Sequence, residues 1–181
     1  MFFKNFTHFV KNYWHKIENL KYKYNMSIFK NKTFQIITSF VVIALVAGLG
    51  SIFVNIGMPW FEVLQKPTQW IPNVVIPIVW TIVYGLFAGI NFFWIKNSGI
   101  SKTTTILMIV NAFLNLLWCL VFFTLNLLFV GNIVIILNLI AGILLWVSIF
   151  KENKVYSYIL SIYPIWLSIA TTLNLTLWIL N

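Results

Sequence analysis

Five long apolar segments dominate the chain, and none of them carries a charged side chain in its interior. They cover approximately Phe34–Phe53, Val74–Ile95, Thr104–Phe123, Val130–Phe150 and Val155–Leu180. Each can cross the hydrocarbon core of a bilayer as a helix, which takes roughly 20 residues. A helix also satisfies the backbone hydrogen bonds that lipid cannot. The sequence therefore predicts an all-α integral membrane protein, a bundle of five transmembrane helices with a structured loop between the first two.

The composition agrees and excludes several classes of protein. Of the 181 residues, 61% are hydrophobic and 8% are charged, whereas soluble domains carry about 25% charged residues. The single Cys119 excludes an internal disulfide and a metal cluster built on cysteines. The chain has only three carboxylates, and both of its histidines lie near the N-terminus. We therefore predict no metal site and no acid/base catalytic residues. The 12 basic residues include no arginine, the commonest specific base contact, so no nucleic-acid partner is expected.

The lysines divide the chain into two parts and predict its orientation. Residues 1–33 form a basic N-terminal extension with seven lysines, and residues 34–181 form the transmembrane domain. If the N-terminus is cytoplasmic, eleven lysines lie on that side and only Lys66 lies on the other, as the positive-inside rule requires. The C-terminal Asn181 is then extracytoplasmic. The extension is either disordered or a membrane-surface segment, and translation could also start at Met26.

The segment Pro59–Tyr84, between the first two spans, contains three Trp, four Pro and one Lys. This composition is unusual for a plain connection, and it predicts a structured cap over a pocket between the helices. Lys66 precedes Pro67 and lies four residues after Glu62. Its ammonium could pair with Glu62 or receive a ligand carboxylate, and the sequence leaves both open.

Polar and aromatic residues recur on one face of three predicted helices. An Asn side chain in lipid needs a partner, which is either another helix or a ligand. Large aromatic residues supply flat apolar walls, so we expect the three faces to converge on a pocket for a planar hydrophobic molecule. Gly85 and Gly89 form a GxxxG pattern, which predicts a close helix approach and weakly a dimer. The three faces are Trp80, Tyr84, Phe87 and Asn91; Asn111, Asn115, Trp118 and Phe122; and Tyr163, Trp166, Ala170 and Asn174.

These features resemble the TspO/MBR family, also called the translocator protein, tryptophan-rich sensory protein or peripheral-type benzodiazepine receptor family. The likeness runs from about residue 40 to the C-terminus, and three motifs in the right order carry it. The first loop and second helix match at Trp60, Phe61, Leu64, Lys66, Pro67, Pro72, Pro77, Trp80, Thr81 and Tyr84. The third and fifth helices match at Leu114, Asn115, Trp118, Phe122 and Phe123, and at Tyr163, Trp166, Ala170, Leu173 and Asn174.

The chain departs from the family pattern mainly in the loop. Gln69 stands where the family usually has a Trp, Ile71 replaces a Pro, and Val74 replaces a second Trp. The proline of the fifth helix, Pro164, comes two residues after Ile162, which is its family position. The predicted cap could therefore grip a ligand differently from that of other members.

The resemblance implies a membrane receptor or binding protein for porphyrins and related tetrapyrroles, with a role in their regulation or transport and with no required cofactor. The ligand-binding residues it implies are Trp60, Phe61, Lys66, Pro67, Trp80, Tyr84, Asn115, Trp118, Phe122, Tyr163, Trp166, Ala170 and Asn174. One alternative is an enzyme for light- and oxygen-dependent degradation of protoporphyrin, and a second is a sterol or lipid translocator. The family also implies a homodimer, in a bacterial cell membrane rather than the mitochondrial outer membrane. A purely structural scaffold would leave the cap and the three faces unexplained.

Overall fold

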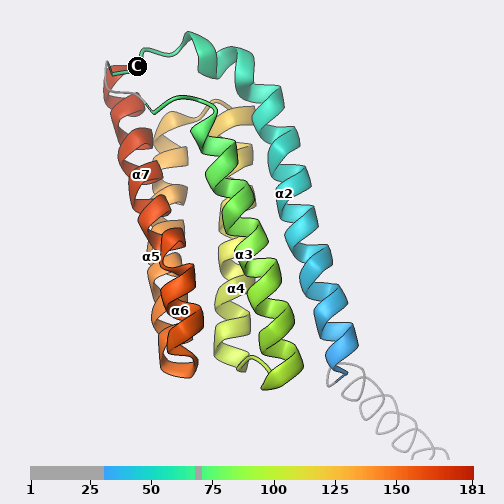
Figure 1. The fold of residues 1–181 in the computed structure, drawn as a ribbon. Coiled ribbons are helices and arrows are strands. Elements are labelled where there is room, and N and C mark those ends of the chain that lie inside the picture. The colour runs from blue at the N-terminus through green and yellow to red at the C-terminus, as the bar shows by residue number, and fades with distance from the viewer. Residues whose placement is uncertain (1–30, 68–70) are drawn as a thin grey trace, which may run out of the picture.

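The computed structural model describes residues 31–67 and 71–181. In this part of the chain, five helical segments are long and apolar enough to cross a membrane, which confirms the predicted fold class. The basic N-terminal extension lies almost entirely outside the described residues, and so do Gln69 and Trp70 of the predicted cap. The helices lie side by side, and the connection between the first two lies at the same end as the C-terminus (Figure 1).

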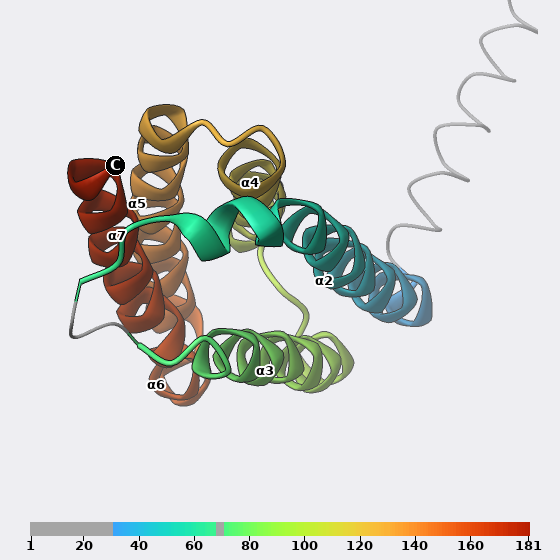
Figure 2. The same cartoon turned by 90° about the horizontal axis from the view of Figure 1, so that it is seen from above.

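The first span is helix α2, Lys32–Val63, and it extends ten residues beyond the predicted end at Phe53. Asn31 caps its N-terminus, because the Asn31 carboxamide oxygen accepts a hydrogen bond from the backbone of Thr33 at 2.9 Å. Pro59 lies inside this helix, where it removes one backbone hydrogen bond and favours a bend. The last turn of α2 lies across the end of α4 and points toward α7 (Figure 2). Pro59, Trp60 and Phe61 are therefore helical rather than part of a loop.

The second span is α3, Val75–Asn97, and the third combines α4, Lys102–Trp118, with a π-helical turn, η1, Cys119–Thr124. In η1 the backbone N–H of Leu125 bonds the carbonyl of Leu120, five residues earlier, at 2.9 Å. Such π-turns commonly occur at functional sites.

The fourth span is α5, Leu128–Glu152. The fifth is divided into α6, Lys154–Leu160, and α7, Ile162–Leu180, with the break at Ser161. Pro164 explains the break, because its ring clashes with the carbonyl four residues earlier and it has no N–H to donate. The sequence predicted one continuous helix over this span, and the proline interrupts it.

Close helix approaches occur at glycines other than those of the predicted GxxxG. A Cβ added to Gly57 of α2 would lie 2.0 Å from the carbonyl oxygen of Phe123 in η1. At Gly85 and Gly89 an added Cβ would have no neighbour within 4 Å. The expected close approach at the GxxxG is thus absent within the described chain. The close contact occurs instead at Gly57, where α2 packs against η1.

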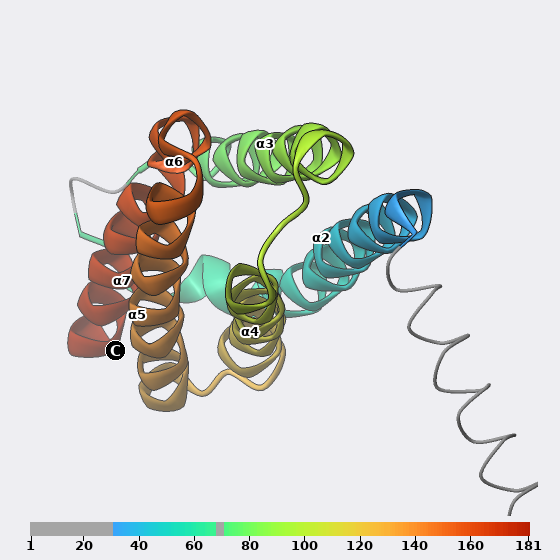
Figure 3. The same cartoon turned by 90° about the horizontal axis from the view of Figure 1, so that it is seen from below.

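The packing leaves one side of the bundle tight and the other loose. Helix α4 packs closely on α5, and α5 packs on α7, whereas α2 contacts mainly η1 and α3. Figure 3 shows the arrangement of α2, α3 and α4 from the end where α2 begins. The cavities described below lie between these three helices.

Candidate functional site

Two cavities lie between α2, α3 and the α4–η1 span. The first, of about 350 Å³, lies beside the connection between α2 and α3, and we call it the linker cavity. Its walls include Met58, Phe61, Trp80, Trp118 and Cys119. The walls are mostly apolar and aromatic, as in most small-molecule sites.

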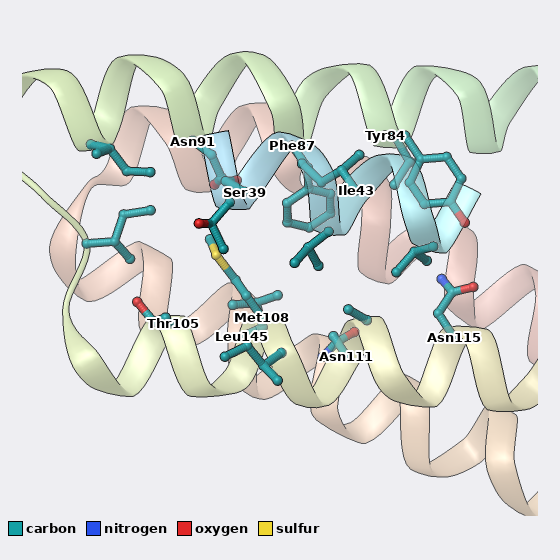
Figure 4. A pocket seen from close by; sticks show the side chains of 18 of the residues that line it. Ser39, Ile43, Tyr84, Phe87, Asn91, Thr105, Met108, Asn111, Asn115 and Leu145 are labelled. Atoms are coloured by element: carbon teal, nitrogen blue, oxygen red, sulfur yellow. The ribbon is translucent and has the colours of Figure 1, made fainter. Parts of the chain in front are cut away.

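The second cavity, of about 420 Å³, extends toward the start of α2 and the end of α3, and we call it the base cavity. Its side chains come mainly from α2, α3 and α4 (Figure 4), and Leu145 of α5 and Tyr163 of α7 also line it. The apolar positions Ile43, Phe87 and Met108 form much of its wall. Both volumes fall in the range of about 300–1,000 Å³ that ligand pockets occupy.

Trp80, Tyr84 and Asn115 line both cavities, so they form the wall between them. The rings of Trp80 and Tyr84 are stacked, with centroids 5.6 Å apart and an interplanar angle of 27°. Trp80 also contacts the ring of Tyr163 at 6.4 Å. The boundary therefore includes the side chains of these three residues.

Several buried polar atoms around the cavities have no hydrogen-bond partner among the described residues. In the linker cavity these are the side-chain oxygen Oδ1 of Asn115 and the indole Nε1 of Trp118. Both residues are more than nine-tenths buried. An unpaired polar group costs free energy when buried, and native proteins satisfy most of them. A ligand that supplies one donor and one acceptor would satisfy both atoms.

The base cavity has its own unpaired atoms, in amides that neighbouring residues hold in place. The hydroxyl of Tyr163 donates to Asn111 Oδ1 at 2.5 Å, which leaves Asn111 Nδ2 unpaired. Asn91 Nδ2 donates to the hydroxyl of Ser39 at 2.9 Å, which leaves Asn91 Oδ1 unpaired. The cavity thus has an unpaired amide nitrogen on α4 and an unpaired amide oxygen on α3.

The structure brings six of the predicted site residues to the cavities. Phe61, Trp80, Tyr84, Asn115 and Trp118 line the linker cavity, and Tyr163 lines the base cavity. Trp60 and Phe122 lie behind this lining, where their rings contact each other edge to face at 5.7 Å. They support the wall formed by Phe61 and Trp118.

The rest of the predicted face on α7 lies elsewhere. Trp166 and Asn174 are buried in the packing of α7, and Asn174 donates to Asn132 of α5 at 3.0 Å. Ala170 packs against the aromatic cluster that contains Trp118 and Phe122. These three residues line neither cavity, so their contact with a ligand stays a prediction.

The first described end of the connection between α2 and α3 contacts the end of α7 and the last turn of α2. The Asn181 carboxamide pairs with the backbone of Gln65, accepting from its N–H at 2.9 Å and donating to its carbonyl at 3.1 Å. The Lys66 ammonium lies 4.6 Å from the centre of the Phe61 ring and bonds the backbone carbonyl of Glu62 at 3.3 Å. Pro67 is partly buried. Asn73, near the other described end of the connection, lines the linker cavity.

Sequence reasoning did not find the contribution of α2. Its small and apolar residues Ser39, Ile43, Val46 and Gly50 form one wall of the cavities. The segment is hydrophobic all round, so periodicity gave no face. Asn91 and Asn111 lay on predicted faces, but they were not among the predicted binding residues.

The fold and these cavities define an integral, multi-pass membrane protein with internal space for a small apolar molecule. The model of the TspO/MBR family matches residues 38–179, so the chain belongs to the TspO/MBR family. It is similar to the tryptophan-rich protein TspO of Bacillus cereus, with 28% identity over 80% of this chain and 97% of the relative. It is also similar to the protein CrtK of Rhodobacter capsulatus, with 29% identity over 78% of this chain and 89% of the relative.

Proposed function

We propose that the protein binds a tetrapyrrole, or a similar flat hydrophobic molecule, in the linker cavity. The observation that carries the proposal is the pairing of aromatic walls with two unsatisfied polar atoms in one cavity. Trp80, Trp118 and Phe61 supply the walls, and Asn115 Oδ1 and Trp118 Nε1 supply the polar atoms. Family membership and the tryptophan-rich relative support the same proposal.

The chemistry of a metal-free porphyrin fits these groups. Its ring faces stack on aromatic side chains, which stabilises such contacts by about 0.5–1.5 kcal/mol each beyond their buried area. A protonated propionic acid group can donate to Asn115 Oδ1, and an ionised carboxylate can accept from Trp118 Nε1 or from Lys66. The ring would extend toward the Trp80–Tyr84 wall, where rearrangement opens further volume.

The proposal includes an orientation and a location. The lysine distribution favours a cytoplasmic N-terminus, which puts the linker cavity on the extracytoplasmic side of the membrane. Both relatives come from bacteria, so a bacterial cell membrane is the proposed location. The ligand would then enter beneath the connection between α2 and α3, in a role of tetrapyrrole regulation or transport.

The test is a titration of the purified protein in nanodiscs with protoporphyrin, in the dark, followed by quenching of tryptophan fluorescence. We expect saturable quenching that Trp118→Ala weakens at least tenfold. Trp146→Ala is the matched control, because Trp146 donates to the Ser157 carbonyl at 3.0 Å and lines neither cavity. Equal losses in both variants, or no saturable quenching, would contradict the proposal.

A second candidate function is the light-dependent degradation of protoporphyrin by oxygen. It is favoured by the position of two tryptophans, Trp80 and Trp118, in the walls of one cavity. Illumination of the same complex in air should then decrease the porphyrin absorbance. The double variant Trp80→Phe, Trp118→Phe should stop that decrease in the porphyrin that remains bound. Loss at the rate of free porphyrin would exclude this function. A sterol is the next ligand to titrate if porphyrin fails to bind.

A further inference from the structure

The base cavity has three unpaired polar atoms, of which the tetrapyrrole proposal uses only Asn115 Oδ1. Its unpaired polar atoms form a row along the cavity, in the order Asn91 Oδ1, Asn111 Nδ2 and Asn115 Oδ1 (Figure 4). All three residues are more than nine-tenths buried. The row therefore reads acceptor, donor, acceptor from the base of the cavity to its inner wall.

The spacing of this row can be judged from the helices that carry it. Asn91 comes seven residues after Tyr84 on α3, which is about 10 Å along the axis at 1.5 Å per residue. Asn111 comes four residues before Asn115 on α4, which is about 6 Å. Tyr84 and Asn115 lie at the same end of the cavity in Figure 4. One ring with polar groups on opposite edges spans such a distance, whereas a single hydroxyl does not.

The surroundings of the row restrict the ligand further. No charged side chain lines this cavity among the described residues, so a neutral molecule is favoured over an ion. Phe87, Tyr84 and Tyr163 offer aromatic surfaces for a ring. Val42 of α2 and Ile109 of α4 both line the cavity and are exposed on the outside of the bundle. A hydrocarbon tail can therefore leave the cavity between α2 and α4 and stay in the bilayer.

We propose that the base cavity is a second binding site, which takes the head group of a membrane quinol. One hydroxyl of the quinol donates to Asn91 Oδ1. The other accepts from Asn111 Nδ2 and donates to Asn115 Oδ1. The ring lies against Phe87 and the tail passes between Val42 and Ile109. The oxidised quinone has no O–H groups, so it satisfies only Asn111, and the site distinguishes the two redox states.

The tetrapyrrole and the quinol are both proposed to use Asn115 Oδ1, so Asn115 does not distinguish the two sites. The distinguishing residues are Asn91 and Asn111, which line only the base cavity. Tyr163 holds the amide of Asn111, and Ser39 holds that of Asn91. These contacts hold the two amide groups in place beside the cavity, which reduces the entropic cost of binding.

The test uses the protein in nanodiscs and a benzoquinol with a decyl tail, kept reduced under argon, with binding measured by equilibrium dialysis. The quinone and the 1,4-dimethyl ether with the same tail are compared on the unchanged protein. We expect the quinol to bind about tenfold more tightly than either, because each loses its O–H donors. Equal affinity of the three molecules would overturn the proposal, as would decanoate binding more tightly than the quinol.

Two variants locate the site. Asn91→Leu should weaken quinol binding about tenfold and reduce the preference over the quinone, whereas Asn111→Leu should weaken both forms. Thr171→Val is the matched control, because the Thr171 hydroxyl bonds its own helix at the Leu167 carbonyl and lines neither cavity. Unchanged quinol binding in both Asn variants would overturn the assignment. If a variant elutes as an aggregate, the comparison of the quinol, the quinone and the dimethyl ether on the unchanged protein still tests whether the cavity prefers the quinol.

Discussion

The two sides of the bundle differ in how well they are packed. In their most hydrophobic windows, 11% of the residues of α2 and 17% of those of α3 are buried, against 39% in each of the other three spans. On the packed side the helices approach closely, for example at Gly142, where an added Cβ would lie 2.7 Å from a side-chain carbon of Leu167. On the loose side, an added Cβ at Gly48, Gly85 or Gly89 would have no neighbour within 4 Å.

This difference explains why the cavities lie where they do. The α4–η1 span contributes to both sides, because it packs on α5 and also forms a wall of each cavity. A ligand site benefits from one fixed wall that positions polar groups and one movable wall that admits the ligand. Here α4 and η1 supply the fixed wall, and α2 and α3 supply the movable one. Stability should therefore depend on the first side and ligand exchange on the second.

The largest effect is expected at the contact that joins the two sides. Gly57→Ala places a methyl group against the backbone carbonyl of Phe123, which no rotamer change relieves. Overpacking of this kind costs about 1–3 kcal/mol, so the apparent melting temperature in detergent should fall by several degrees. Gly85→Ala is the control, and it should not lower the melting temperature, because its methyl meets open space. A melting temperature equally low in both variants would contradict the view that Gly57 is closely packed and Gly85 is not.

A smaller loss of stability is expected on the packed side from Glu152→Gln. The Glu152 carboxylate accepts from the Ser101 hydroxyl at 2.5 Å, from the Ser101 N–H at 3.2 Å and from the Thr104 hydroxyl, which joins α5 to the start of α4. The neutral amide has one acceptor oxygen in place of two, so it loses at least one of these bonds, at a cost of about 1 kcal/mol. Thermal unfolding should shift accordingly while the protoporphyrin titration stays unchanged. The exposed Glu62→Gln is the control, and a change in the titration would show that the packed side also governs binding.

The smallest effect on stability is expected from Asn181→Ala, which should instead change the rate at which bound porphyrin dissociates. This change removes the two hydrogen bonds that hold Gln65 of the connection against the end of α7. We expect bound porphyrin to dissociate about two- to fivefold faster in stopped-flow experiments, with little change in melting temperature. Thr176→Val is the control, since its hydroxyl bonds the Thr172 carbonyl within the same helix. An unchanged dissociation rate would mean that the ligand leaves by another route.

Much of the loose side was predictable from periodicity. Trp80, Tyr84, Phe87 and Asn91 share one face of α3 by spacing alone, and all four line the base cavity. The five spans followed from hydropathy, because lipid admits few alternatives to a helix. Their ends were less accurate, since Pro59 lies within α2 instead of ending it.

The features that sequence could not predict depend on contacts between distant segments. The π-turn at Cys119–Thr124 accompanies the approach of Gly57 to Phe123, and no local pattern marks it. Trp166 and Asn174 have the spacing of a cavity face, yet α7 directs them into its packing with neighbouring helices. Polar periodicity identifies a buried face, but it does not distinguish a helix neighbour from a ligand.

The comparison of Trp118 with Trp166 therefore tests the central claim most directly. Both indole Nε1 atoms are buried without a hydrogen-bond partner among the described residues, but only Trp118 lines a cavity. Protoporphyrin should be titrated against Trp118→Phe and Trp166→Phe in nanodiscs, with melting temperatures recorded on the same samples. The predicted result is a several-fold loss of affinity for Trp118→Phe and none for Trp166→Phe. A loss at Trp166→Phe as large as that at Trp118→Phe, at equal stability, would place the ligand on the packed side and contradict the account.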